Sequence, residues 1–241
     1  MTKKFRKGQC AYCLRSFDDL TSDHVLPQSW YTETTSPDME KWQAPACGKC
    51  NAEMGKIENR LLIQIGLCVP PFEHESLGIA HKALKSLRYE CGRDKRDQEA
   101  REKSRRTVLE RAVDLTEIPL SSILPRFGFH PGMDPSQELG IPVSVSDLRA
   151  IGEKIIRGTT WVLEKSYIDK GHRIEIMFPR TPTVGPFFED LQRFGRLYSL
   201  GPGLNILRAR ADDGQSAIYL IEIWGRLHMY GCVAPVKSAE E

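Results

Sequence analysis

Two Cys-x-x-Cys pairs, Cys10/Cys13 and Cys47/Cys50, are the residues of this chain best suited to bind a metal ion. Each pair places two sulfurs on one side of a tight turn, so two pairs together can complete a tetrahedron around zinc. A small unit with little core gains folding free energy from such an ion. The sequence therefore predicts a closed, structural four-thiolate zinc site.

Three residues that can support hydrolysis lie around this predicted site. Asp23 and His24 fall between the two cysteine pairs, and Asn51 directly follows the second pair. An imidazole titrates near neutral pH and can accept a proton from water, whereas carboxylate and amide oxygens suit a hard divalent cation. Successive residues of a regular strand point to opposite faces, so Asp23 and His24 can share a site only if their strand bends or ends there. Pro27 favours such an early end.

Residues 10–56, about a fifth of the chain, resemble the HNH (ββα-metal) endonucleases, in the branch that carries a four-cysteine zinc. The matching stretches are C-A-Y-C, D-H-V-L-P and C-G-K-C-N-A-E-M-G-K. The resemblance implies that His24 is the general base and that Asp23 and Asn51 hold one catalytic Mg²⁺ or Mn²⁺. It also implies hydrolysis of DNA phosphodiester bonds, which leaves 5′-phosphate and 3′-hydroxyl ends.

The chain departs from the family pattern at one position. Relatives carry an asparagine shortly before the second cysteine pair, where its hydrogen bonds hold the loop, but Trp42 stands at the expected place here. Gln43 is a candidate substitute. The family's lysine after the last cysteine pair is present as Lys56, and the resemblance implies that it neutralises a phosphate.

The net charge of +2 does not by itself indicate nucleic-acid binding, but the basic residues are clustered. One cluster lies at the N-terminus and contains Lys3, Lys4, Arg6, Lys7 and Arg15. We expect Arg6, Lys7 and Lys56 to contact DNA phosphates. A second basic group, interleaved with acids, lies between Arg88 and Arg111. Within it, residues 93–111 are either a solvated helix face or a phosphate-contacting arm.

The pattern of apolar residues predicts an α+β protein with three parts. Residues 1–70 form the zinc-stapled HNH unit, residues 71–145 a helical segment and a Pro-rich linker, and residues 146–241 an α+β module with a mainly antiparallel sheet. The expected elements are a loop over 28–45, a helix from 47 to before 70, one or two helices over 73–115 broken at Gly92, helices over 146–167 and 186–194, and strands over 173–178, 204–209, 217–224 and 226–233.

Two further features bear on location and partners. The basic N-terminus has no apolar run behind it, and the longest apolar stretch, 61–69, is too short to span a bilayer. Together with the paired cysteines, this predicts a reducing cytoplasm and association with the nucleoid. The expected partners are double-stranded or branched DNA and no membrane, with residues 146–241 pairing two copies or binding a regulatory protein.

Two other functions remain open from the sequence. The first is a zinc-knuckle protein that binds DNA or RNA without catalysis, in which Asp23, His24 and Asn51 only cap turns and a helix. The second is a protein-interaction adaptor built on the zinc site.

Overall fold

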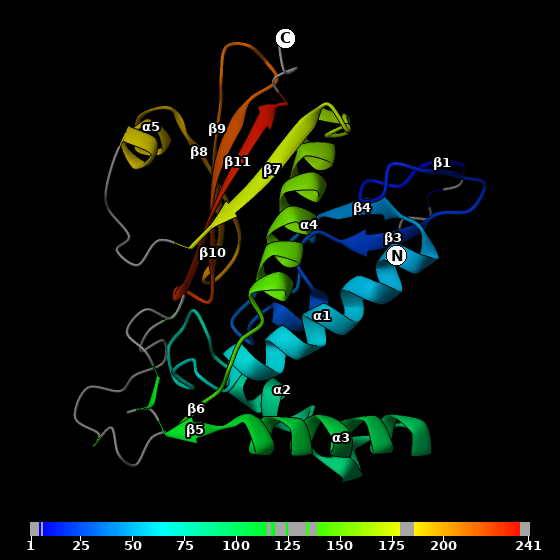
Figure 1. Ribbon diagram of the computed structural model, residues 1–241, viewed down its shortest axis with the longest axis vertical. Helices are drawn as coiled ribbons and strands as arrows, with labels where there is room; N and C mark the ends of the chain where they lie inside the picture. Colours follow the sequence, from blue (N-terminus) through cyan, green and yellow to red (C-terminus); the bar gives the residue numbers. More distant parts are fainter. Residues whose placement is uncertain are drawn as a thin grey trace.

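The computed structural model describes residues 5, 7–114, 117–118, 124, 134, 139–178 and 186–236. This part of the chain is mixed α+β and ends in an antiparallel sheet, as the sequence predicts (Figure 1). The sheet has five strands, because β8 (Arg196–Gly201) adds to the four that were expected. Within these ranges, no helix is both long enough and apolar enough to cross a membrane.

The N-terminal elements are short strands followed by one long helix. Strands β1 (Gly8–Gln9) and β2 (Ser16–Phe17) pair antiparallel and enclose the turn that carries the first cysteine pair. Strand β3 (Thr21–His24) pairs antiparallel with β4 (Gln43–Ala46), and helix α1 (Gly48–Gly66) follows β4 almost directly. β3 ends at His24, in agreement with the early strand end expected from Pro27.

Strand β4 corrects the prediction of a loop over residues 28–45. That segment contains a 3-10 helix (Gln28–Trp30) and then the strand. Pro45 argued against a strand, but β4 belongs to a two-stranded sheet, where a residue without an N–H is tolerated. The carbonyl of Pro45 accepts a hydrogen bond from the N–H of Ala11 at 2.8 Å. This bond joins the β3–β4 hairpin to the turn that carries the first cysteine pair.

The middle of the chain is helical, as expected, and contains α2 (Ile79–Lys85), a 3-10 turn (Tyr89–Cys91) and α3 (Lys95–Arg111). No residue of α3 is buried, and Asp97 forms ion pairs with Arg93 and Arg101 on its surface. Strands β5 (Val113–Asp114) and β6 (Leu139–Gly140) pair antiparallel beyond it. Most of the Pro-rich linker predicted over 116–145 lies outside the described residues.

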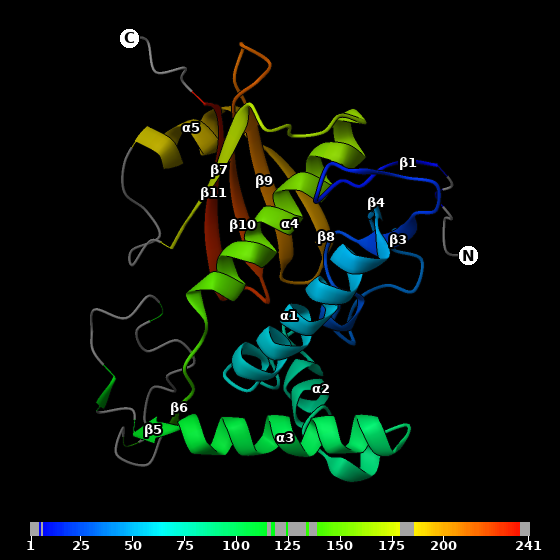
Figure 2. The same cartoon turned by 45° about the vertical axis from the view of Figure 1, so that its right-hand side comes forward.

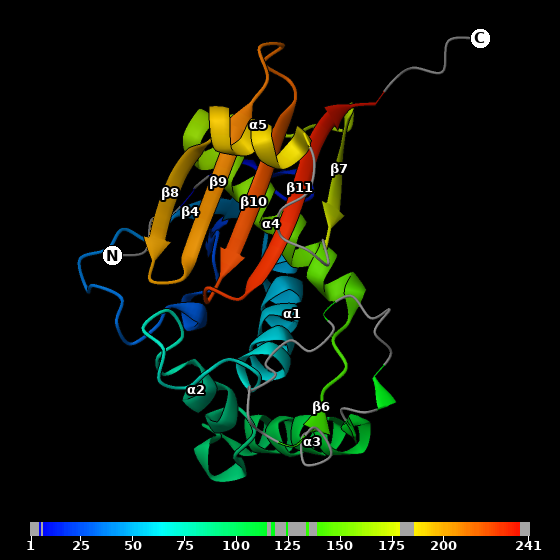
Figure 3. The ribbon, with the colours of Figure 1, turned by 90° about the vertical axis from the view of Figure 1, so that its left-hand side faces the viewer.

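The C-terminal part is a sheet with one helix on each face. Helix α4 (Val145–Glu164) is capped by Ser144, whose Oγ accepts from the N–H of Asp147 at 3.2 Å. The sheet has the order β7-β11-β10-β9-β8. Figure 3 shows α5 across one face and α4 behind the other. The remaining bounds are β7 (His172–Met177), α5 (Pro186–Phe194), β8 (Arg196–Gly201), β9 (Leu204–Arg210), β10 (Ala217–Ile223) and β11 (Leu227–Pro235).

Helix α4 packs against both the N-terminal elements and the C-terminal sheet. It lies between the sheet and the elements β3, β4 and α1 (Figures 1 and 2). One hydrophobic cluster runs through all three layers and includes Leu26 after β3, Ile155 of α4 and Ile221 of β10. The predicted boundaries of the three parts remain a prediction, but the first and last parts share this core.

Replacing Trp224 with phenylalanine tests that shared core. The two buried indoles of Trp30 and Trp224 lie 5.2 Å apart, and Nε1 of Trp224 donates to the carbonyl of Trp30 at 2.8 Å. The phenylalanine side chain has no N–H, so the buried carbonyl of Trp30 loses this hydrogen bond. We therefore expect the free energy of unfolding to fall by about 1–3 kcal/mol. Urea denaturation measures it, with Trp161→Phe at a half-buried indole as the control that should cost less. Equal costs would contradict the account.

Candidate metal centre and hydrolytic site

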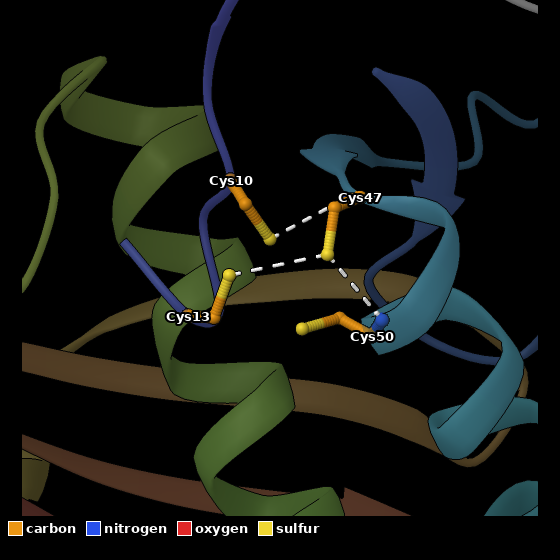
Figure 4. A group of neighbouring side chains, drawn as sticks. All are labelled: Cys10, Cys13, Cys47 and Cys50. Carbon is orange, nitrogen blue, oxygen red and sulfur yellow. Dashed lines mark hydrogen bonds between the residues drawn. The ribbon is translucent and has the colours of Figure 1, made fainter. Parts of the chain in front are cut away.

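The four predicted cysteines converge. The Sγ atoms of Cys10, Cys13, Cys47 and Cys50 all lie within 4.8 Å of one another, and Figure 4 shows the four side chains directed toward a common centre. Sulfurs bound to zinc at about 2.3 Å in a tetrahedron are about 3.8 Å apart. The Cys13 and Cys47 sulfurs are 3.9 Å apart, so this cluster can hold a structural ion such as zinc.

Backbone hydrogen bonds favour the thiolate form in this cluster, whereas burial acts against it and raises the pKa of Cys10 and of Cys50. The N–H of Cys47 donates to the sulfur of Cys10 at 3.4 Å, and the N–H of Cys50 donates to the sulfur of Cys47 at 3.4 Å (Figure 4). Burial acts to raise the pKa of Cys47, but hydrogen bonds, first from the Cys50 backbone, outweigh it and lower the pKa. The turn closes because Leu14 adopts a left-handed φ of 62° and its N–H bonds the Cys10 carbonyl at 3.0 Å.

Asp23 lies on the buried side of β3. Its side chain is only 8% exposed, and its two oxygens lie 3.0 and 3.2 Å from the ammonium of Lys154, a fully buried side chain of α4. The same ammonium donates to Glu58 of α1. Burial raises the pKa of Glu58, and Lys154 acts in the opposite direction. Three elements therefore meet at one buried ion cluster made of Asp23, Glu58 and Lys154.

His24 lies at the end of β3, half-buried, directly opposite Gln43 in the register of the hairpin. Its Nε2 lies 3.1 Å from Nε2 of Gln43, and Ser22 donates to Oε1 of the same amide at 2.6 Å. Gln43 thus ties β3 to β4. Burial lowers the pKa of His24, Asp23 opposes this, and Lys154 and Lys41 lower it further. A lowered pKa keeps the imidazole neutral and able to accept a proton.

Asn51 lies in the first turn of α1 and faces β3. Its Nδ2 donates to Oγ1 of Thr21 at 3.1 Å, a bond that does not use its carbonyl oxygen. Thr21 and Asp23 lie on one face of β3 and His24 on the other, because side chains alternate along a strand. The structure thus brings Asn51 to the face that carries Asp23. A joint role of Asp23, Asn51 and His24 remains a prediction.

Two of the three residues predicted to contact DNA phosphates lie within the described part of the chain. Lys56 is exposed on α1, and Lys7 is exposed and lies 3.6 Å from Asp18 in a surface ion pair. Arg6 lies outside the described residues.

Lys154 and Glu58 were not among the predicted site residues. Both are distant in sequence from Asp23, so no local spacing connects them. One signal was present: Lys154 interrupts the apolar stretch of α4 between Ile151 and Ile155, and a lysine inside a buried stripe needs an anionic partner.

Comparison with known proteins does not assign the chain to a family. No protein-family model, no curated protein and no solved structure matches it.

Proposed function

We propose that this protein is a metal-dependent DNA endonuclease of the HNH type. The observation that carries the proposal is the cluster of four cysteine sulfurs, two from the β1–β2 turn and two from the start of α1. An ion bound there would join the β1–β2 turn, which precedes the strand that ends in His24, to the start of the helix that carries Asn51. The order β3, β4, α1 is the arrangement of strand, strand and helix that the sequence resemblance implies.

His24 is the proposed general base. Its lowered pKa keeps a lone pair on the ring at neutral pH, which is needed to accept a proton from the attacking water. The side-chain amide of Gln43 fixes the ring through Nε2. As described, the Gln43 amide N–H donates to Nε2, which places the ring proton on Nδ1. In the other orientation of the amide, its oxygen accepts from Nε2–H and the lone pair lies on Nδ1.

Asp23 and Asn51 are the proposed ligands of the catalytic cation. Their donor set, one carboxylate and one amide oxygen on the same side of β3, suits Mg²⁺ or Mn²⁺. When bound, such an ion stabilises negative charge on the phosphate and on the departing 3′ oxygen. With few protein ligands, the chain leaves coordination positions for waters and phosphate oxygens.

The proposed substrate is double-stranded or branched DNA. Lys7 and Lys56 are exposed and available for phosphate contacts, and Arg6 would add to them. Such contacts add affinity without reading the base sequence. Residues 146–241 would supply any sequence preference, a second copy or a regulatory partner. A DNA substrate would place the protein at the nucleoid in the cytoplasm.

A second candidate function has an observation of its own. The Asp23 carboxylate is already paired with Lys154, and the Asn51 amide is already bonded to Thr21. Both residues would then be structural, and the protein would be a zinc-knuckle nucleic-acid-binding protein without catalysis.

End-labelled duplex and branched DNA separate the two candidates. With Mg²⁺ or Mn²⁺, the endonuclease yields shortened strands with 5′-phosphate and 3′-hydroxyl ends. Salt-sensitive binding that leaves every strand intact with both ions would favour the second candidate.

A further inference from the structure

The buried ion cluster contains more negative than positive charge. Lys154 supplies one ammonium, with a side chain that is 0% exposed, and it faces two carboxylates, those of Asp23 and Glu58. An uncompensated buried charge is costly, so the excess charge of the cluster favours an additional cation nearby. When a divalent cation binds at Asp23, this excess negative charge attracts it.

The position of Glu58 on α1 relates the cluster to the proposed cation site. Glu58 follows Asn51 by seven residues, which is two helical turns, so both side chains lie on the same face of α1. Asn51 contacts β3 at Thr21, and Glu58 meets the Asp23 carboxylate through Lys154. Asp23 therefore lies beside the buried ammonium and two residues along β3 from the contact with Asn51.

We propose that Glu58 is a positioning residue for the catalytic cation, because it holds the Lys154 ammonium and leaves the charge of Asp23 for the divalent ion. This inference rests on the proposed function of Asp23 and Asn51. Without a charge on Glu58, Lys154 has Asp23 as its one anionic partner in the cluster, and the carboxylate is neutralised before a divalent cation arrives. Groups that orient and tune a metal ligand in this way change metal affinity by about 10–100-fold when they are replaced.

The test is Mn²⁺ binding to the full-length, zinc-loaded chain without DNA, followed by electron paramagnetic resonance of the free ion. Glu58→Gln keeps the shape of the side chain and its oxygen acceptor while it removes the charge. We expect this variant to raise the Kd for Mn²⁺ by about 10–100-fold. In cleavage assays, the Mg²⁺ concentration for half-maximal rate should rise by a similar factor, with the rate at saturating Mg²⁺ unchanged.

Asp147→Asn is the matched control. Asp147 and Arg60 form the other ion pair between α4 and α1, with bonds of 2.8 and 2.9 Å, and the Asp147 side chain is 13% exposed against 16% for Glu58. The two variants make the same chemical change in the same pair of helices, but Asp147 is not among the partners of Asp23. We expect Asp147→Asn to leave the Kd for Mn²⁺ unchanged.

Three outcomes overturn the inference. The first is a Glu58→Gln variant that binds Mn²⁺ as tightly as wild type. The second is an Asp147→Asn variant that loses as much Mn²⁺ affinity as Glu58→Gln. The third is Mn²⁺ binding by the wild type that does not depend on Asn51. A wild type that binds Mn²⁺ through Asn51 and loses affinity in Glu58→Gln, but cuts no DNA, would support the inference and reject the proposed endonuclease.

Discussion

Replacing His24 with alanine is expected to slow DNA cleavage by about 10²–10⁴-fold, because the variant has no group to take the proton of the attacking water. DNA affinity should persist, since phosphate contacts depend on basic side chains rather than on the imidazole. The fold should persist as well. His24 is half-buried and bonds Gln43 at the edge of a hairpin, so its loss leaves the core intact. Single-turnover cleavage with protein in excess measures the rate, and filter binding measures the affinity.

His74→Ala is the control for this variant. His74 is exposed after α1, and the described bond at this residue uses its backbone carbonyl, which alanine retains. We expect it to cut at the wild-type rate. Cleavage by His24→Ala at the wild-type rate would show that another group is the base and would reject the mechanism proposed for His24.

Replacing Cys47 with serine is expected to release the zinc and destabilise the protein. Zinc contributes about 10–16 kcal/mol of apparent binding free energy in small peptides that fold around it. The hairpin and α1 also pack in a large core here, so we expect only part of this, about 3–5 kcal/mol, which corresponds to about 6–20 °C in Tm for a chain of this length. Cleavage should also fall, because the β1–β2 turn loses its attachment to the start of α1, where Asn51 lies. Zinc content and calorimetry measure the effect.

Cys91→Ser is the matched control, because this half-buried thiol lies in the 3-10 turn after α2 and outside the four-sulfur cluster. It should retain zinc and the wild-type Tm. A Cys47→Ser variant that retains one zinc per chain, or a wild type purified without any zinc, would contradict the assignment of the four sulfurs to a zinc ion.

The elements that the sequence predicted best are those set by periodicity. The stripe of Leu61 and Ile65 marks α1, and alternation over residues 217–224 marks β10, because each buries one face. Strand β8 (Arg196–Gly201) was missed because its exposed Leu197 and buried Leu200 do not alternate regularly, and its register shifts near Gly201. Strand β4 was missed because Pro45 reads as a strand breaker, whereas an edge position tolerates it.

The metal centre was predictable because cysteine spacing is local, and two close pairs leave few other interpretations. The surroundings of Asp23 were not predictable. Its ammonium partner Lys154 comes from α4, far along the chain, and only the packing of α4 between the sheet and α1 brings them together. Asp23 and His24 are successive residues of β3, so they can serve one site only because the strand ends at His24.

The most direct measurement of the central claim is a titration of supercoiled plasmid cleavage with Mg²⁺ and, separately, with Mn²⁺, using a chain loaded with one zinc. The account predicts intact plasmid with zinc alone and a saturable rise in nicked circles as either divalent ion is added. Plasmid that stays supercoiled at every concentration of both ions, while the protein still binds it, would contradict the claim that this fold hydrolyses DNA.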